Sequence, residues 1–333
     1  MLLDDLNRLT AHHIAACKTY GDYVRSVFGT APATNLAEVP FLPVRAFKDF
    51  ALRSVPEADV YKTMRSSGTS GAFSQIFLDK ETARLQTLTL VDSFADTFGK
   101  GRFPMLVIDA ASTVEDRTRF SARTAAINGF SMFSRKRCFA LNDDLTLDLP
   151  RIRTFLDEAG DKPVFVFGFT FLIWQALVKE LRARGETLAF QSAFVLHGGG
   201  WKKLEAEKVA PQAFKDALAE TTGCTAVHNY YGMVEQTGTI FLECEHGRMH
   251  AGARGAALTR SPETHAVLKD GETGLLQVFS AIQRSYPGHA LLTEDVGRTF
   301  AGTTCPCGRP GTIVEVDGRL ALAEVRGCSD AYS

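Results

Sequence analysis

Apolar positions in the middle of the chain fall into short runs that alternate with segments of helical periodicity. The runs at 102–110 (RFPMLVIDA), 163–169 (PVFVFGF) and 192–197 (SAFVLH) have the length and the β-branched or aromatic content of buried strands. The segment at 149–160 (LPRIRTFLDEAG) has helical periodicity and ends in glycine, and a further helical stretch is broken at Pro211. This alternation predicts an α/β fold built on a largely parallel, doubly wound sheet.

The pattern changes toward the C-terminus, where short strand-like runs are separated by glycine and proline turns and no helix is predicted. Such runs occur at 265–270 (HAVLKD), 274–282 (GLLQVFSAI) and 311–318 (GTIVEVDG). We therefore expect an α/β body over residues 1–235 and a small β subdomain over residues 236–333.

Composition and charge restrict the classes of function. Of the 333 residues, 45% are hydrophobic and 23% charged, and 37 basic side chains balance 38 acidic ones. This near-neutral charge argues against a general electrostatic attraction to nucleic acid, and no nucleic-acid partner is expected. The N-terminus lacks the apolar core of a signal peptide, and the longest uncharged apolar run, 163–178, is shorter than a membrane span. A soluble, cytoplasmic protein is expected, in which the seven cysteines are reduced thiols, metal ligands or a nucleophile.

A short polar loop between two extended segments is the first candidate for chemistry. Small hydroxyl residues and glycines allow backbone N–H groups to approach an anion closely, and the hydroxyls add donors. The loop lacks the lysine of a Walker A motif, and by itself the pattern favours a flexible turn over a phosphate loop. Its residues are Ser66, Ser67, Gly68, Thr69, Ser70 and Gly71.

Three further candidates lie at the ends of predicted strands. Consecutive glycines at 198–200 follow a strand at its carboxyl end, where open α/β sheets bind ligands, and three in a row indicate a flat group against the backbone. Tyr231 and Glu235 end the next strand, where an aromatic ring can stack on a base and a carboxylate can hold a cation. Asp295 follows the apolar run HALL. Four such elements in this order indicate one ligand site.

The order of these motifs resembles the adenylate-forming superfamily. The pieces RSSGTSGAFSQ, VLHGGGWKK, NYYGMVEQ, LLTEDVG and CPCGRPGTIVEVDGR are similar to its branch of bacterial acyl-protein synthetases from bioluminescence fatty-acid reductases, which are related to phenylacetate-CoA ligases. The resemblance extends over residues 35–330. It implies an adenylate-forming enzyme body with doubly wound sheets, a small β subdomain, and ATP and Mg²⁺ as cofactors.

The resemblance also implies a role for each candidate residue. The loop at 66–71 would bind phosphates, Glu235 would bind Mg²⁺, and Asp295 and the hinge arginine Arg319 would contact the ribose. The adenine site would consist of Gly198, Gly199, Gly200, Tyr231 and Gly232.

Three departures from the family pattern affect this site. Val234 replaces the threonine that usually precedes the Mg²⁺ glutamate, and Leu320 to Leu322 replace the acidic pair after the hinge arginine. The sequence ends at Ser333, so the family's C-terminal lid domain, with its adenylation lysine, is expected to be absent. The open alternatives for the missing cation are Lys202, Lys203 and Arg65.

The reaction implied by the resemblance is ATP-dependent activation of a carboxylic acid, expected to be a fatty acid, to acyl-AMP. The acyl group would then pass to an enzyme cysteine and on to an acyl-accepting reductase or carrier protein. Cys328 is the candidate nucleophile, because it lies in the polar tail VRGCSDAYS and matches the acceptor cysteine near the C-terminus of the acyl-protein synthetases. The other interpretation of Cys328 is an incidental surface cysteine. Two alternative functions stay open: an acyl- or aryl-CoA ligase, and a non-catalytic nucleotide- or acyl-binding subunit.

The remaining cysteines include a candidate metal site. Two thiols one residue apart, with a distant cysteine and histidine, match the ligand types of tetrahedral zinc. Related ligases include members with a C-x₅-H…C-x-C zinc knuckle, and this pattern implies a structural zinc bound by Cys244, His250, Cys305 and Cys307. His246 is the competing imidazole, and four unmetallated loop residues are the alternative. Core positions are expected for Cys17, Cys138 and Cys224.

Overall fold

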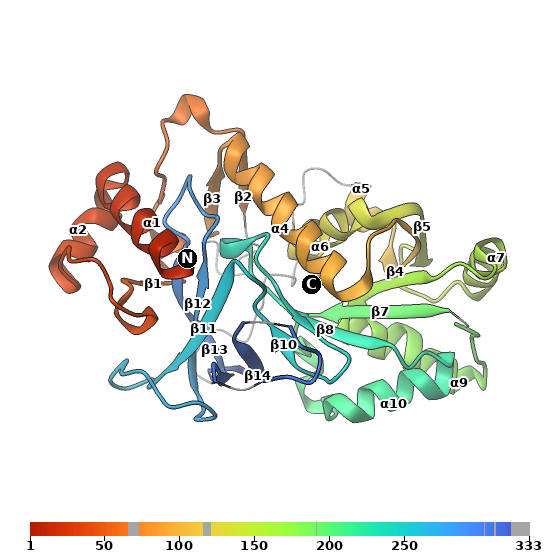
Figure 1. Ribbon diagram of the computed structural model, residues 1–333. Helices are drawn as coiled ribbons and strands as arrows, with labels where there is room; N and C mark the ends of the chain where they lie inside the picture. The colour runs from red at the N-terminus through yellow and green to blue at the C-terminus, as the bar shows by residue number, and fades with distance from the viewer. Residues whose placement is uncertain (66–72, 116–120, 191, 303, 310, 321–333) are drawn as a thin grey trace. The chain divides into compact units, whose positions relative to one another are not determined.

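The computed structural model describes residues 1–65, 73–115, 121–190, 192–302, 304–309 and 311–320 (Figure 1). By their internal contacts, the residues form two compact units. One unit combines Met1–Phe98 with Tyr231–Ser333, and the other is the continuous segment Gly99–Tyr230. The boundary between body and subdomain that we expect after Glu235 stays a prediction.

The continuous unit is a parallel α/β sheet whose strands pair in the order β8-β7-β6-β4-β5. The strands are β4 (Phe103–Ala110), β5 (Ser134–Leu141), β6 (Val164–Phe169), β7 (Ala193–Gly198) and β8 (Val227–Tyr231). The α/β alternation predicted from the sequence is therefore confirmed, since β4 and β6 form within the apolar runs at 102–110 and 163–169 and β7 overlaps the run at 192–197.

Helices cover both faces of this parallel sheet. They are α5 (Ser112–Glu115), α6 (Ala122–Phe130), α7 (Leu149–Ala159), α8 (Thr170–Leu172), α9 (Lys179–Arg184) and α10 (Pro211–Thr222), with shorter turns η3 (Ser131–Phe133), η4 (Ile173–Val178) and η5 (Lys202–Glu207). Val164 and Val166 of β6 belong to a core that includes α7 and α10, whereas Phe165 and Phe167 contact the ring of Phe130 in α6. This two-residue alternation buries apolar side chains on both faces, as a parallel sheet requires.

Local sequence fixes the ends of the helices. The Asp148 side chain accepts a hydrogen bond of 2.9 Å from the backbone amide of Arg151, which caps the first turn of α7. Gly160, at φ +57°, ends the same helix. Pro211 occupies the first turn of α10, where its missing N–H costs nothing, so the break predicted there is a helix start.

The discontinuous unit contains an antiparallel sheet in the order β11-β12-β13-β14-β10-β9. Its strands are β9 (Phe241–Glu243), β10 (Met249–His250), β11 (Gly255–Arg260), β12 (Gly274–Ser280), β13 (Ala290–Phe300) and β14 (Ile313–Arg319). A short strand β1 (Leu42–Pro43) runs parallel to β13, and β2 (Lys62–Arg65) pairs antiparallel with β3 (Gln75–Leu78). The helices are α1 (Leu2–Ala16), α2 (Lys18–Val27), α3 (Ala46–Asp49) and α4 (Lys80–Phe98), with turns η1 (Leu36–Glu38), η2 (Glu57–Asp59) and η6 (Val234–Gln236).

Helix α1 is attached to this unit through buried imidazoles. The His13 ring contacts Ser54 Oγ at 2.7 Å and the Gln283 carbonyl at 2.9 Å. His289 Nε2 lies 2.9 Å from Thr10 Oγ1, and its ring stacks on that of His13 with centroids 5.0 Å apart. Burial lowers the pKa of His13 well below its ordinary value and that of His289 to about 3, so both rings are neutral at physiological pH.

Not every element follows from the sequence pattern. The prediction of a strand at 265–270 is wrong. This run contributes only one residue, Val267, to an isolated bridge with Arg260, in the turn that joins β11 and β12. His265 has a positive φ of 57° and Val267 is 41% exposed, because the run follows the bend of a hairpin. Across the described residues, no helix is long and apolar enough to cross a membrane.

Candidate functional site

Three of the residues that the sequence analysis selected meet at the carboxyl end of β8. Tyr231 donates its hydroxyl to Asp295 Oδ2 over 2.7 Å. Arg319 is the direct cross-strand partner of Asp295 in the β13–β14 ladder, and its Nε lies 3.6 Å from Asp295 Oδ1. The carboxyl group of Asp295 thus has a hydrogen-bond donor on one oxygen and a cation beside the other, although the three residues are far apart in the sequence.

The backbone around Asp295 fixes the direction of its side chain. Thr293 Oγ1 accepts a hydrogen bond of 3.1 Å from the Asp295 amide and donates one of 2.8 Å to the Leu276 carbonyl. A bulge between Val296 and Gly297 shifts the register of β13 against β14. A Cβ at Gly297 would lie 2.1 Å from the Glu315 carbonyl oxygen, so only glycine fits the bulge.

Burial shifts the pKa of both Asp295 and Tyr231, the acceptor and the donor of this hydrogen bond. Burial raises the pKa of the Asp295 carboxyl, and the hydrogen bond from Tyr231 and the charge of Arg319 act in the opposite direction. Burial and the neighbouring Asp295 raise the pKa of Tyr231 well above its ordinary value, so the phenol keeps its proton. A carboxylate held in this way can accept hydrogen bonds from hydroxyl groups of a ligand.

Glu235 lies on the turn η6, which is anchored from several sides. The Tyr286 hydroxyl donates to the Glu235 carbonyl over 2.9 Å. Gln236 Nε2 donates to the carbonyls of Val278 at 3.1 Å and Gly288 at 2.8 Å. The turn is therefore held in one position by buried hydrogen bonds.

Glu235 is 5% exposed, and burial raises the pKa of its carboxyl group. A hydrogen bond with Ser74 and the charges of Lys48 and Arg319 act in the opposite direction. A buried carboxylate is unfavourable unless a cation compensates its charge, and carboxylate oxygens are the ligands that Mg²⁺ prefers. This residue could hold a divalent cation.

The expected phosphate loop, Ser66 to Gly71, lies outside the described residues. Its flanks are β2 and β3, which pair up to Arg65 and Gln75. Ser74, directly before β3, is the residue that hydrogen-bonds Glu235. The β3 side of the loop is thus connected to the candidate cation ligand.

The glycines at 198–200 belong to the other unit, at the end of β7. A Cβ at Gly198 would lie 2.3 Å from the Tyr230 ring, and one at Gly199 would lie 2.9 Å from the Phe169 ring. Gly199 also has φ +77°, which favours glycine. Packing within the protein therefore explains two of the three glycines, and only Gly200 has open space around its Cα.

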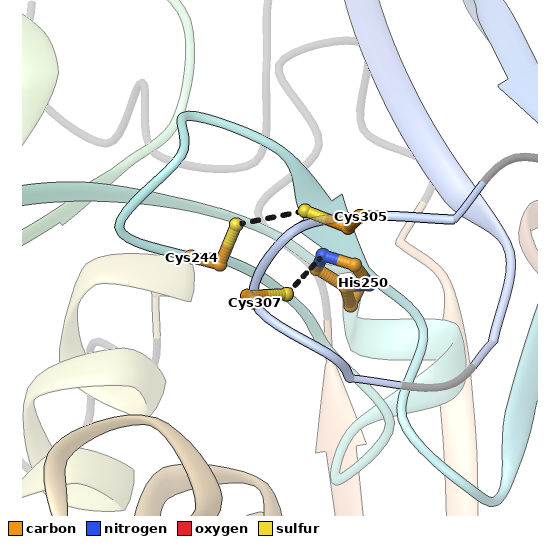
Figure 2. A group of neighbouring side chains, drawn as sticks. All are labelled: Cys244, His250, Cys305 and Cys307. Atoms are coloured by element: carbon orange, nitrogen blue, oxygen red, sulfur yellow. Dashed lines mark hydrogen bonds between the residues drawn. The ribbon is translucent and has the colours of Figure 1, made fainter.

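The predicted metal ligands come together in the discontinuous unit (Figure 2). One ligand atom from each residue lies within 4.8 Å of the others in the set of Cys244, His250, Cys305 and Cys307. The Sγ atoms of Cys244 and Cys305 are 3.7 Å apart, and Cys307 Sγ lies 3.4 Å from His250 Nε2. His246 is exposed, and it contributes only its backbone amide, which donates to Cys244 Sγ over 3.4 Å.

The chemistry of this cluster fits zinc. Two Zn–S bonds of about 2.3 Å at a tetrahedral angle put the sulfurs about 3.7 Å apart, the separation seen here, whereas a disulfide needs about 2 Å. Both cysteine turns have the same form: Gly247 donates to the Cys244 carbonyl and Gly308 to the Cys305 carbonyl, each over 3.0 Å. The Arg309 amide donates to Cys307 Sγ over 3.4 Å, which matches the amide on Cys244 and would stabilise a thiolate.

The other cysteines give a mixed outcome. Cys17 and Cys224 are buried, which confirms the expected core positions, and Cys138 is half-buried. Cys328, the candidate nucleophile, lies outside the described residues.

Sequence reasoning missed several residues that hold the site. Tyr286 is a buried donor to the Glu235 carbonyl, and nothing in its local sequence distinguishes it from a core residue. Gln236 donates to the carbonyls of Val278 and Gly288, and its place in the motif NYYGMVEQ was the available signal. Ser74 lies inside the motif RSSGTSGAFSQ, so its position beside the polar loop was the available signal.

Residues 2–333 match the family model described as acyl-protein synthetase, LuxE. This chain belongs to the acyl-protein synthetase family. It is an AMP-forming ligase, as the family resemblance implies. A relative in Aliivibrio fischeri, the long-chain-fatty-acid–luciferin-component ligase, is 22% identical over 299 residues that cover 89% of this chain and 78% of the relative. The protein of the same name in Vibrio harveyi is 23% identical, with 90% and 78% covered.

Solved structures of adenylate-forming ligases share the fold of this acyl-protein synthetase. A 2-hydroxyisobutyryl-CoA ligase in complex with 2-HIB-AMP and CoA matches with a TM-score of 0.74 and 15% identity, covering 96% of this chain and 67% of the ligase. ATP-bound MatB from Rhodopseudomonas palustris matches with a TM-score of 0.52 and 17% identity, covering 81% of this chain and 50% of MatB. The predicted fold class is confirmed by these neighbours.

Proposed function

We propose that this chain activates a fatty acid with ATP and passes the acyl group through its own cysteine to a partner reductase. The observation that carries the nucleotide part is the Asp295 carboxyl between Tyr231 and Arg319. The relatives of this family are named as ligases of long-chain fatty acids and a luciferin component, which supports the choice of acid and an acceptor protein in a luminescence reductase complex.

In the first step, the fatty acid carboxylate attacks the α-phosphate of ATP, and pyrophosphate leaves. Both reactants are anions, so the site must position them and compensate their charge. Asp295 would accept hydrogen bonds from the ribose hydroxyls, and Tyr231 would lie against the adenine. Glu235 would hold Mg²⁺, which supplies positive charge beside the phosphates when bound. The charge of Arg319 acts on the carboxyl groups of both Glu235 and Asp295, so this side chain would help to hold the two groups at a fixed distance from each other.

In the second step, a thiolate attacks the acyl carbonyl of acyl-AMP, the C–S bond forms, and AMP leaves. We propose Cys328 as this thiol, because it matches the acceptor position of the family and Arg326 beside it would favour the anion. The thioester would then be delivered to the partner reductase.

We further propose that Cys244, His250, Cys305 and Cys307 hold a structural zinc. With four protein ligands, no coordination position remains for substrate, so the metal would have no direct part in the chemistry.

The test is acid-dependent exchange of pyrophosphate into ATP over a series of fatty acids and aromatic acids. We expect exchange with fatty acids that the Asp295→Ala variant loses, and no release of AMP on addition of CoA. CoA-dependent AMP release would instead identify a CoA ligase. ATP binding without exchange for any acid would contradict the proposed reaction.

A further inference from the structure

The metal cluster lies beside the first residue of β14, the strand that carries Arg319. Strand β10 is only two residues long, and it pairs with β9 on one side and with β14 on the other. His250, a member of the cluster, is the cross-strand partner of Ile313, the first residue of β14. A strand this short makes few hydrogen bonds of its own, so on the β10 side backbone pairing adds little to the ladder in which Ile313 pairs with Phe300 of β13.

Packing and ion pairs connect the cluster to the same point. Ile313 is fully buried in a small core with Cys244 and Cys305. Arg309, between the cysteine turn and β14, forms an ion pair with Glu245, the residue after Cys244. Its guanidinium also donates to the Asp96 carbonyl in the last turn of α4 over 3.4 Å. The two cysteine turns are therefore joined to each other beside the start of β14.

The far end of β14 is where the nucleotide residues lie. Arg319 pairs with Asp295 beyond the bulge at Gly297, and its Nε lies 3.6 Å from Asp295 Oδ1. Successive side chains of a strand point to opposite faces, so a shift of β14 by one residue would turn Arg319 away from Asp295. Arg319 is the last residue of β14 and Ile313, the partner of His250, is the first, so the cluster and the nucleotide residues lie at the two ends of one strand.

We propose that the metal-loaded cluster of Cys244, His250, Cys305 and Cys307 is a positioning device that fixes the register of β14 and thereby holds Arg319 opposite Asp295. Zinc binding and nucleotide binding are then coupled through one strand, although no metal ligand contacts the nucleotide. Coupling is reciprocal, so ATP also tightens the binding of zinc. This inference rests on the proposed nucleotide function of Asp295 and Arg319.

The experiment measures the dissociation constant of ATP for the zinc-loaded chain and for the same chain after removal of zinc by a chelator. Three proteins are compared: the wild type, Arg319→Ala and Arg298→Ala. Arg298 is the matched control, because it lies on β13, interacts across the same ladder with Glu315 and Asp317, and has no contact with Asp295 among the described interactions. We expect removal of zinc to weaken ATP binding about tenfold in the wild type and in Arg298→Ala. In Arg319→Ala the loss is expected to be less than about twofold, since the group that zinc positions is missing.

Amide hydrogen exchange shows whether the metal acts locally. Zinc removal should speed the exchange of the amides at 313–319 and leave the β12–β13 ladder protected. Equal losses of ATP affinity in all three proteins, or faster exchange throughout the sheet, would show a general structural role and overturn the inference. If Arg319→Ala weakens ATP binding while zinc removal has no effect on it, the inference fails but the proposed nucleotide function stands. If Arg319→Ala leaves ATP affinity unchanged, the nucleotide assignment is wrong and the inference falls with it.

Discussion

Ser74, next to the candidate phosphate loop, hydrogen-bonds the carboxyl group of Glu235, which lies on a different segment of the chain. Burial raises the pKa of this carboxyl above its ordinary value. The folded state therefore holds the proton more tightly than the unfolded state, and the stability that Glu235 contributes is lost as the pH rises through the raised pKa. Above the ordinary pKa range of a glutamate, the buried carboxyl therefore destabilises the ligand-free protein.

Glu235→Gln should accordingly raise the free energy of unfolding at neutral pH, since the amide has the same shape without the charge. The same variant should lower pyrophosphate exchange by about 100-fold or more, because the cation loses its carboxylate. Chemical denaturation and the exchange assay measure the two effects. Reduced stability with normal exchange would contradict the assignment of Glu235 as a cation ligand.

Asp295→Ala should weaken ATP binding by about tenfold or more, because hydrogen bonds to a charged group contribute about 1.5–3 kcal/mol each. Titration calorimetry measures the affinity, and circular dichroism checks that the variant is folded. Asp317→Asn is the control: Asp317 lies on β14 and interacts with Arg298. Unchanged ATP affinity in a folded Asp295→Ala protein would remove this residue from the site.

Metal analysis of protein purified without chelators should find about one zinc per chain, as expected for a single site with four ligands. The double change Cys305→Ser and Cys307→Ser should abolish the zinc, whereas Cys138→Ser, at a half-buried position outside the cluster, should retain it. Wild-type protein without zinc would contradict the metal site.

Cys328→Ser should separate the two steps of the proposed reaction. Acid-dependent pyrophosphate exchange depends on adenylation alone and should persist. The hydroxylamine-labile acyl label on the protein depends on the thiol and should disappear. Labelling that survives this change, or that is lost instead with Cys17, Cys138 or Cys224, would identify another nucleophile.

The imidazoles beneath α1 predict a loss of stability in acid. Burial lowers the pKa of His289 to about 3 from an ordinary value of 6.5, so in this window the unfolded chain binds the proton and the folded chain does not. Stability is therefore intact above pH 6.5 and falls as the pH decreases toward 3. His289→Gln should flatten this dependence in denaturant titrations, while His265→Gln, at an exposed position, should not.

Sequence reasoning predicts the parallel unit well because its signals are local. The strand β6 and the helix α7 form where an apolar run and a helical periodicity that ends in glycine predict them. It predicts the edge strand β5 poorly, because the run SRKRCFAL has exposed basic residues at its start and resembles a loop. The residues Tyr231, Asp295 and Arg319 were chosen by family motifs, whereas their hydrogen bonds depend on a bulge at Gly297 that no periodicity encodes.

The unit that holds Asp295 and Glu235 is interrupted in the sequence by the whole of the segment Gly99–Tyr230. On the ribosome, the N-terminal part of this unit emerges long before the strands β9 to β14 that complete its sheet. The parallel unit is continuous, so it can fold as soon as it has emerged. Until then, helix α1 and strand β1 lack partners such as His289 and β13, so their apolar surfaces are exposed to solvent. During synthesis of this ligase there is therefore an interval in which about the first hundred residues are not yet folded and are prone to aggregation unless a chaperone binds them or they collapse on themselves.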